Sequence, residues 1–353
     1  MSSSPVYAAD ALIRFAEALF RAAGLNDEMA REVAEVLVEG DLLGHDTHGL
    51  ALAASYLEEI EAGAMIHDGR PDVLSDSGAA IVWDGRMLPG PWLTRRAVQL
   101  ACDRAQRHGL AAVSIRRSHH IACLMAYLNA ATERGLMLLM ATSDPADASV
   151  APFGGLRAVF TPDPIAVGIP TERDPILIDL SSSITTNAMT QRLRRKGERF
   201  PGIWAIDAEG RPSDDPAVVA ADPPGTLLPA GGLDHGHKGY GLALTVEALT
   251  QGLAGHGRAD RPTGWGAGVF VQALDPAAFG GTEAFRRQIE WIAEACRSNP
   301  PRPGVERVRL PGERSLALRR QALAQGLRLR PEILDALAPS AKRFGVPLPQ
   351  PVL

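Results

Sequence analysis

Between residues 78 and 181 the chain alternates short apolar runs with longer amphipathic stretches, and this alternation constrains the fold more than any other feature. Apolar runs of this length bounded by turn residues predict strands, whereas an apolar period near 3.6 predicts helices. Strands are expected at residues 78–85, 110–115, 136–142, 164–170, 175–181 and 268–274, and helices at 94–109, 122–135, 237–255 and 282–298. The strands at 164–170 and 175–181 either pair as a hairpin or lie as neighbours. The alternation is typical of an α/β layer.

Both ends of the chain are predicted to be helical. Helices are expected at residues 9–23, 26–43, 314–326 and 330–337, and a further helix is expected to begin at Asp46 or Thr47 and to run to Gly63. We therefore expect a helical N-terminal part, residues 1–75, packed with the C-terminal segment 314–353, and an α/β part at 76–313. Within the α/β part, residues 185–235 look dominated by loops, and 305–313 are predicted to form a strand ending in a turn.

Composition excludes several classes of function. A chain of 353 residues suggests two domains, at roughly 100–200 residues each. The net charge of −5 favours neither a nucleic-acid partner nor a membrane surface. Cys102, Cys123 and Cys296 lie far apart and form no CxxC pair, so we expect no disulfide framework and no structural zinc site. The N-terminus lacks the pattern of a signal peptide, and no apolar run approaches about 18 residues, so a cytoplasmic location is expected.

The stretch GDLLGHDTHGL, residues 40–50, places Asp46, Thr47 and His48 together where a helix is expected to begin. A Thr or Asp before a helix is a common N-cap, which would leave His48 without a role. The functional alternative is a general acid or base. A helix N-terminus lowers the pKa of a histidine and a neighbouring carboxylate raises it, so His48 would be poised near neutrality.

The stretch RRSHHIACL, residues 116–124, is expected at the turn between a strand and a helix, and it contains Arg116, Ser118, His119 and His120. Ligands of α/β sheets gather at the carboxyl ends of strands. Adjacent histidines point in different directions, so only one of the two is expected to face a given site. The alternative is a solvated loop capped by Ser118. A metal site is not favoured, because HHxxC is not a standard ligand spacing.

The stretch GHKGYGLAL, residues 236–244, opens a predicted helix with three glycines and Lys238. Glycines and a helix N-terminus suit a phosphate, although neither GxGxxG nor a P-loop is present. The alternative is a helix packed closely on a neighbour. A hydrolase is disfavoured, since the chain has no GxSxG motif.

The order and spacing of these motifs are more specific than any one of them. Together with ATSDPADASVAPFGG, PDPIAVGIPT, ILIDLSSS and PGVERVRLPGE, they resemble the malate/L-lactate dehydrogenase family that is unrelated to the Rossmann-fold lactate dehydrogenases. The resemblance runs from about residue 10 to 340. It implies a non-Rossmann α/β oxidoreductase fold, with a helical N-terminal part and a mixed α/β part that binds cofactor and substrate. It also implies NAD or NADP as cofactor, a small-molecule substrate and a homodimer.

The resemblance also implies roles for individual residues. His48 would protonate the carbonyl oxygen of a 2-oxo acid as hydride arrives, oriented by Asp46 and Thr47, and His120 would be a second acid–base candidate. Apart from the resemblance, we expect Arg116 and His119 to bind substrate in place of the arginines that the family often has. Cofactor contacts are implied at Asp144, Ile178, Asp179, Leu180, Ser181, His237, Lys238, Gly312 and Glu313. No metal is expected. The alternatives are a reductase of cyclic 2-imino acids and a cofactor-binding protein that has lost catalysis.

Several positions depart from the family pattern. Leu43 and Leu52 stand where the family often has arginine, His119 replaces the usual Asn, and Asp163 replaces another Asn. Ala188-Met189 stand where a lysine is often found. Because arginine binds carboxylates through two parallel hydrogen bonds, the first two changes predict a substrate other than plain malate or lactate.

Overall fold

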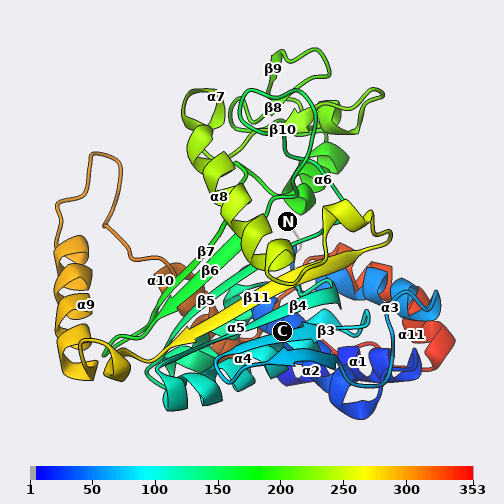
Figure 1. Cartoon of the computed structure of the whole chain (residues 1–353). Coiled ribbons are helices and arrows are strands. Elements are labelled where there is room, and N and C mark those ends of the chain that lie inside the picture. Colours follow the sequence, from blue (N-terminus) through cyan, green and yellow to red (C-terminus); the bar gives the residue numbers. More distant parts are fainter. Residues whose placement is uncertain (1–4, 353) are drawn as a thin grey trace.

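The computed structural model describes residues 5–352 and is built on one mixed sheet of seven strands. The strand order is β2-β3-β4-β11-β5-β6-β7, and only β3 and β4 pair in parallel (Figure 1). The strands are β2 (Asp72–Asp76), β3 (Ala80–Asp84), β4 (Leu110–His119), β5 (Met137–Ser143), β6 (Pro164–Ile169), β7 (Ile176–Ser181) and β11 (Gly266–Leu274). The predicted α/β layer is confirmed, and β6 and β7 pair antiparallel as successive strands.

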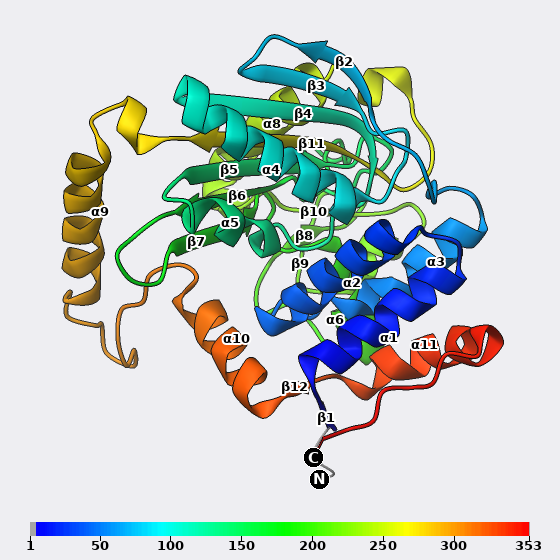
Figure 2. The same ribbon diagram turned by 90° about the horizontal axis from the view of Figure 1, so that it is seen from below.

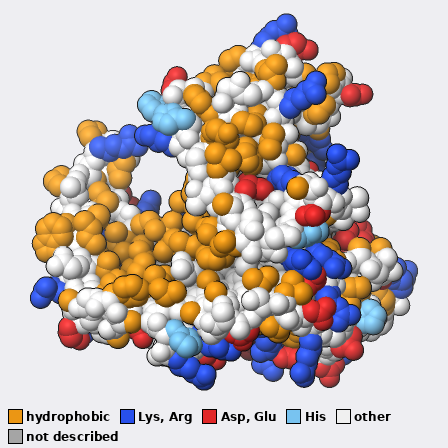
Figure 3. All heavy atoms as spheres, viewed as in Figure 1, with side chains coloured by type: hydrophobic (Ala, Val, Ile, Leu, Met, Phe, Trp, Pro, Cys, Tyr) orange, Lys and Arg blue, Asp and Glu red, His pale blue; other side chains and the backbone are white. Residues whose placement is uncertain are grey.

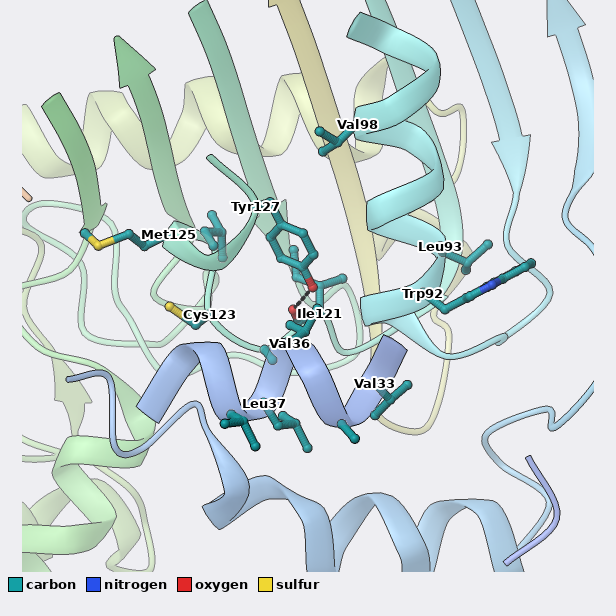
Figure 4. Close-up of a cluster of buried hydrophobic side chains, with 14 of the residues drawn as sticks. Val33, Val36, Leu37, Trp92, Leu93, Val98, Ile121, Cys123, Met125 and Tyr127 are labelled. Atoms are coloured by element: carbon teal, nitrogen blue, oxygen red, sulfur yellow. Dashed lines mark hydrogen bonds between the residues drawn. The ribbon is translucent and has the colours of Figure 1, made fainter. Parts of the chain in front are cut away.

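One face of the sheet is covered by helices. Helices α4 (Gly90–His108) and α5 (Met125–Thr132) lie directly on it, and α1 (Ala9–Ala22), α2 (Asp27–Leu42) and α3 (Ala53–Glu61) lie beneath them (Figure 2). The main hydrophobic core fills this space. In Figure 4, Val36 of α2 points toward Ile121, Val33 and Leu37 lie on the opposite side of α2, and the Tyr127 hydroxyl donates to the Ile121 carbonyl. This core holds the segment that follows β4.

The N-terminal and C-terminal helices are in contact. Strand β1 (Val6–Tyr7) pairs with β12 (Leu327–Arg328), α10 (Glu313–Gln325) packs on α2, and α11 (Pro331–Phe344) packs on α1 and α3. Apolar side chains of the C-terminal segment, including Leu316, Ile333 and Leu337, belong to the main core. The division at residues 75 and 313 stays a prediction.

The opposite face of the sheet carries a small lobe and α8 (His237–Glu247), which continues as a π-helical turn, Ala248–Gly252 (Figure 1). The lobe contains α6 (Asn187–Lys196), α7 (Gly232–His235), β8 (Ala205–Ile206), β9 (Pro212–Ser213) and β10 (Thr226–Leu227). Helix α9 (Thr282–Arg297) stands apart at the far edge (Figure 1). Short 3₁₀ turns lie at Leu50–Leu52, Pro216–Ala220, Arg258–Asp260 and Pro276–Ala278. No helix of the described chain has the length and hydropathy needed to span a membrane.

Four sequence expectations were wrong in detail. The third helix begins at Ala53, after a turn and a 3₁₀ segment, and not at Asp46 or Thr47. Residues 305–313 form no strand, because they run as an irregular segment into α10. The segment 185–235 contains α6, α7 and a three-stranded sheet, which its Pro and Gly content concealed. Strand β4 also continues to His119, so Arg116 and Ser118 lie within a strand and not in a turn.

Candidate active site

His48 lies in a turn that a buried carboxylate holds in place. The Asp41 carboxylate, near the end of α2, accepts a 2.7 Å hydrogen bond from the Leu50 backbone N–H. Gly49 passes so close to Asp41 that a Cβ on Gly49 would overlap that carboxylate. Thr47 Oγ1 lies 3.0 Å from His48 Nδ1, as expected for a residue that orients the imidazole. The sequence analysis missed Asp41, because an acid on the apolar side of a helix carries no local signal of function.

The pKa of His48 is not near neutrality. Burial and the neighbouring His45 together lower it to about 4, and Asp46 offsets only part of their effect. The sequence interpretation assumed a helix N-terminus and a strong carboxylate effect, and it underestimated burial. His48 is therefore neutral at pH 7.

Asp41 also titrates abnormally, because burial raises its pKa from 3.8 to about 7. Between about pH 4 and 7 the folded chain holds this proton and the unfolded chain has released it, so raising the pH favours unfolding. We expect Asp41→Asn, which keeps an acceptor for the Leu50 N–H, to lose stability less steeply over this range than the wild type. Unfolding midpoints measured from pH 4 to 7 test this prediction, with the exposed Asp234→Asn as control. If the midpoints of wild type and Asp41→Asn changed equally with pH, the Asp41 proton would not contribute to stability.

His120 faces His48 across the site. Their ring centroids are 6.1 Å apart and the planes are nearly parallel at 28°. His120 also stacks on Trp265, with centroids 4.6 Å apart, and its Nδ1 lies 2.8 Å from the Tyr56 hydroxyl. The Ala122 N–H donates to the same Nδ1 at 3.3 Å, so the neutral ring carries its proton on Nε2. Burial and the two neighbouring histidines keep the pKa of His120 well below 6.5.

The two predicted substrate residues have other partners. Arg116 donates to the buried Asp84 at 3.0 Å, and Arg117 donates to the same carboxylate at 3.2 Å. His119 is fully buried, and its Nε2 lies 3.3 Å from Glu59. The expectation that adjacent histidines diverge is consistent with this geometry, since only His120 faces His48. That Arg116 and His119 bind substrate stays a prediction.

Asp46 lies between two arginines from distant parts of the chain. Arg192 of α6 donates to Asp46 Oδ2 at 3.2 Å, and Arg330 Nε lies 3.5 Å from the same oxygen. Arg330 also lies 3.6 Å from the Glu332 carboxylate, so the two guanidiniums face two carboxylates close to His48. The sequence analysis missed both arginines, because only the fold brings them to this turn.

The predicted cofactor segments at β7 and the Pro-Gly-Glu turn lie side by side. The Leu177 N–H donates to the Pro311 carbonyl at 3.1 Å, and a Cβ on Gly312 would come within 2.7 Å of the Leu177 side chain. Gly312 also has a φ of +89°, which favours glycine. Glu313, however, is paired with Arg297 at 2.7 Å. At the other end of the strand, Asp179 Oδ2 accepts from the Met125 N–H at 2.9 Å.

Asp144 lines a cavity that Trp265 also lines. A cavity of about 500 Å³ is bounded by Asp144, Asp147, Thr263 and Trp265, and Trp265 is the residue that stacks on His120. Burial raises the pKa of Asp144 to about 6. A larger cavity of about 790 Å³ lies in the small lobe beside α6, and none of the predicted site residues lines it.

The glycines before α8 serve close packing. Gly239 is buried against the backbone of Ser182 and Ala230, where a Cβ would overlap both. This agrees with the interpretation of the motif as a helix packed closely on a neighbour. Gly241, by contrast, is exposed, and a Cβ there would meet no other atom. His237 and Lys238 are exposed at the first turn of the helix, and His237 contacts Phe153 edge-on with ring centroids 5.7 Å apart.

Asp163, which replaces an Asn of the family pattern, behaves much as an amide would. It is fully buried, adopts a φ of +44° and accepts a 2.6 Å hydrogen bond from Thr161. Burial and the neighbouring Glu247 raise its pKa to about 8. The side chain is therefore protonated at pH 7 and both donates and accepts, as Asn does.

Comparison with known proteins agrees with the fold. The family model described as malate/L-lactate dehydrogenase matches residues 7–338. An L-lactate dehydrogenase from Cupriavidus necator is 34% identical over 329 residues, covering 91% of this chain and 93% of that protein. A malate dehydrogenase structure from Pyrococcus horikoshii matches with a TM-score of 0.87 at 26% identity, covering 98% of this chain and 97% of that one. A Δ1-piperideine-2-carboxylate reductase structure from Pseudomonas syringae matches with a TM-score of 0.82 at 27% identity, covering 95% and 99%.

The fold and these relatives define an oxidoreductase of the dehydrogenase class. More specifically, the chain belongs to the malate/L-lactate dehydrogenase family, so the family resemblance and the fold class expected from the sequence are confirmed.

Proposed function

We propose that this protein interconverts a 2-oxo acid and its 2-hydroxy acid by hydride transfer, with His48 moving the proton. The observation that carries the proposal is the His48–His120 pair beside the Trp265 cavity. A neutral imidazole is a base, so His48 is ready to accept the hydroxyl proton when a 2-hydroxy acid is oxidised. In the reducing direction His48 must first gain a proton, and an anionic substrate beside it would raise its pKa.

The cofactor we propose is NAD or NADP, which supplies or accepts the hydride when bound. Its proposed contacts are the end of β7 from Ile178 to Ser181, the turn at Gly312, and Asp144. The adjacency of β7 and the turn, and the exposed Leu180 at the strand end, support this location. His237 and Lys238 add exposed nitrogen donors at the start of α8, suited to a phosphate.

For the substrate carboxylate we propose Arg192. Leu43 is buried in the core and Leu52 packs against it, so neither position offers a charge. Arg192 places a guanidinium near His48, paired with Asp46, and Asp46 has Arg330 as a second partner. We expect Arg192→Ala to raise KM for the acid at least tenfold, because a hydrogen bond to a charged group contributes about 1.5–3 kcal/mol. Steady-state kinetics with exposed Arg195→Ala as control test this; an unchanged KM would exclude the role.

A reductase of cyclic 2-imino acids is the second candidate. The low pKa of His48 favours it, because a protonated imine needs no acid when hydride arrives. The structural likeness to a Δ1-piperideine-2-carboxylate reductase adds to this support.

The deciding experiment follows NADH and NADPH absorbance with purified protein. The panel contains pyruvate, oxaloacetate, longer 2-oxo acids and Δ1-piperideine-2-carboxylate, with ureidoglycolate in the oxidising direction. Turnover with an oxo acid supports the first proposal, and turnover with the imine alone supports the second. Cofactor binding without any turnover would indicate a protein that has lost catalysis.

We also propose a homodimer. A broad apolar surface extends from α9 across the open face of the sheet toward α8 (Figure 3). Its exposed residues include Leu180, Leu244, Trp291 and Ile292. Continuous apolar surface of this kind marks association sites. We expect light scattering to give twice the chain mass of 37.5 kDa, and Leu244→Asp to lower that mass toward the monomer. Val73→Asp, on the edge strand β2, is the control, and a monomeric wild type would refute the proposal.

A further inference from the structure

Three potential metal ligands from separate segments meet beside the candidate active site. His45 follows α2, Cys123 lies between β4 and α5, and Asp179 lies near the end of β7. One nitrogen, the sulfur and one carboxylate oxygen all lie within 4.8 Å of one another, and Cys123 Sγ is 3.9 Å from Asp179 Oδ2. Cys123 is buried, and His45 and Asp179 are partly buried.

Other contacts leave these ligand atoms largely free. The His45 imidazole makes no hydrogen bond to any residue of the described chain, and Asp179 uses one oxygen for the Met125 N–H. The Cys123 thiol has only its long contact with Asp179 among described side chains. Figure 4 shows Cys123 between Met125 and α2, in a segment held by the core. The three groups therefore face one another in a fixed setting.

The chemistry of the three groups selects the cation. Imidazole nitrogen, thiolate sulfur and carboxylate oxygen bind Zn²⁺ at about 2.0–2.3 Å. Tetrahedral bonds of that length separate ligand atoms by roughly 3.3–3.8 Å, so the sulfur–oxygen distance is already close to the required one. Ca²⁺ and Mg²⁺ prefer sets made of oxygen ligands and suit this group poorly.

We propose that His45, Cys123 and Asp179 form a site for Zn²⁺ or a similar divalent transition metal, with the fourth coordination position open. On binding, the Cys123 thiol loses its proton to solvent and the sulfur bonds to the metal, with no change of oxidation state. The bound ion would join the His48 turn, the segment after His120 and the end of β7. This inference does not depend on the proposed hydride transfer, because metal binding is measured without substrate or cofactor.

Cobalt titration of the chelator-treated protein tests the site. We expect one Co²⁺ per chain, a near-ultraviolet absorption band from thiolate-to-cobalt charge transfer, and displacement of that band by Zn²⁺. Cys123→Ala should abolish the band and weaken Co²⁺ binding at least tenfold. Cys102→Ala, which removes a buried thiol outside the cluster, should leave both unchanged.

His45→Gln provides a second test at a less buried ligand, and circular dichroism confirms that each variant is folded. The His45→Gln variant should keep the Cys123 ligand but bind Co²⁺ at least tenfold more weakly than the wild type. Zn²⁺ should raise the unfolding temperature of the wild type and not of Cys123→Ala. Absence of the band at stoichiometric Co²⁺, or equal affinity in wild type and His45→Gln, would overturn the proposal.

Discussion

Replacing His48 by alanine is expected to lower kcat for the preferred substrate by roughly 10²–10⁴-fold, because general acid–base catalysis contributes about that much. Binding of the dinucleotide should be largely retained, since His48 is not among the proposed cofactor contacts. His108→Ala, at the exposed end of α4, is the matched control and should keep wild-type turnover.

The pH profile gives an independent measure of the same role. The pKa of His48 is about 4, so oxidation of a hydroxy acid should depend little on this group above about pH 5 and should fall as the pH approaches 4. If His48→Ala keeps more than about a tenth of wild-type turnover while His120→Ala does not, His120 is the acid–base residue and His48 is not.

Replacing Gly90 by alanine is expected to impair both folding and catalysis. Gly90 is buried at the first turn of α4, and a Cβ there would overlap the carbonyl groups of His119 and His120. Overpacking typically costs about 1–3 kcal/mol of the free energy of unfolding. The backbone can relieve the overlap only by moving His120, and a displacement of about 1 Å in an active site can cost about 10²-fold in rate.

Denaturant unfolding and kcat/KM measure these two effects, and Gly241→Ala is the control. Gly241 is exposed within α8 with open space around it, so alanine should stabilise the helix by about 0.5–1 kcal/mol. If Gly90→Ala unfolded at the wild-type denaturant concentration with unchanged kcat/KM, the close packing of α4 on the histidine segment would not position His120.

Local pattern predicted most helices and strands, because their apolar periodicity reflects the faces they bury. The Asp46–His48 turn was placed wrongly for an identifiable reason. Asp41 binds the Leu50 N–H from within the preceding helix, and this contact holds a turn where local capping signals favoured a helix start. The segment at 305–313 was predicted as a strand and does lie beside the edge strand β7, with the Leu177 N–H donating to the Pro311 carbonyl, but it forms no strand ladder there because it turns at Pro311-Gly312.

The candidate site was predictable to the extent that its groups lie in short motifs. His48 and His120 were found because each stands among polar residues at an element boundary. Asp46 was also singled out, but its partners Arg192 and Arg330 are separated from it by more than 140 residues. No local pattern marks such pairs, and only the folded chain shows which charges meet.

The double ion pair at Asp46 also bears on how a substrate enters. Arg192 belongs to the small lobe and Arg330 to the connection before α11, so one carboxylate links both parts to the turn that carries His48. If a substrate carboxylate binds Arg192 as proposed, Asp46 keeps Arg330 as its partner, and entry becomes an exchange of counter-ions. Such an exchange is less sensitive to ionic strength than capture by a free arginine. It also changes the carboxylate partner of Arg192 in the small lobe when the site is filled.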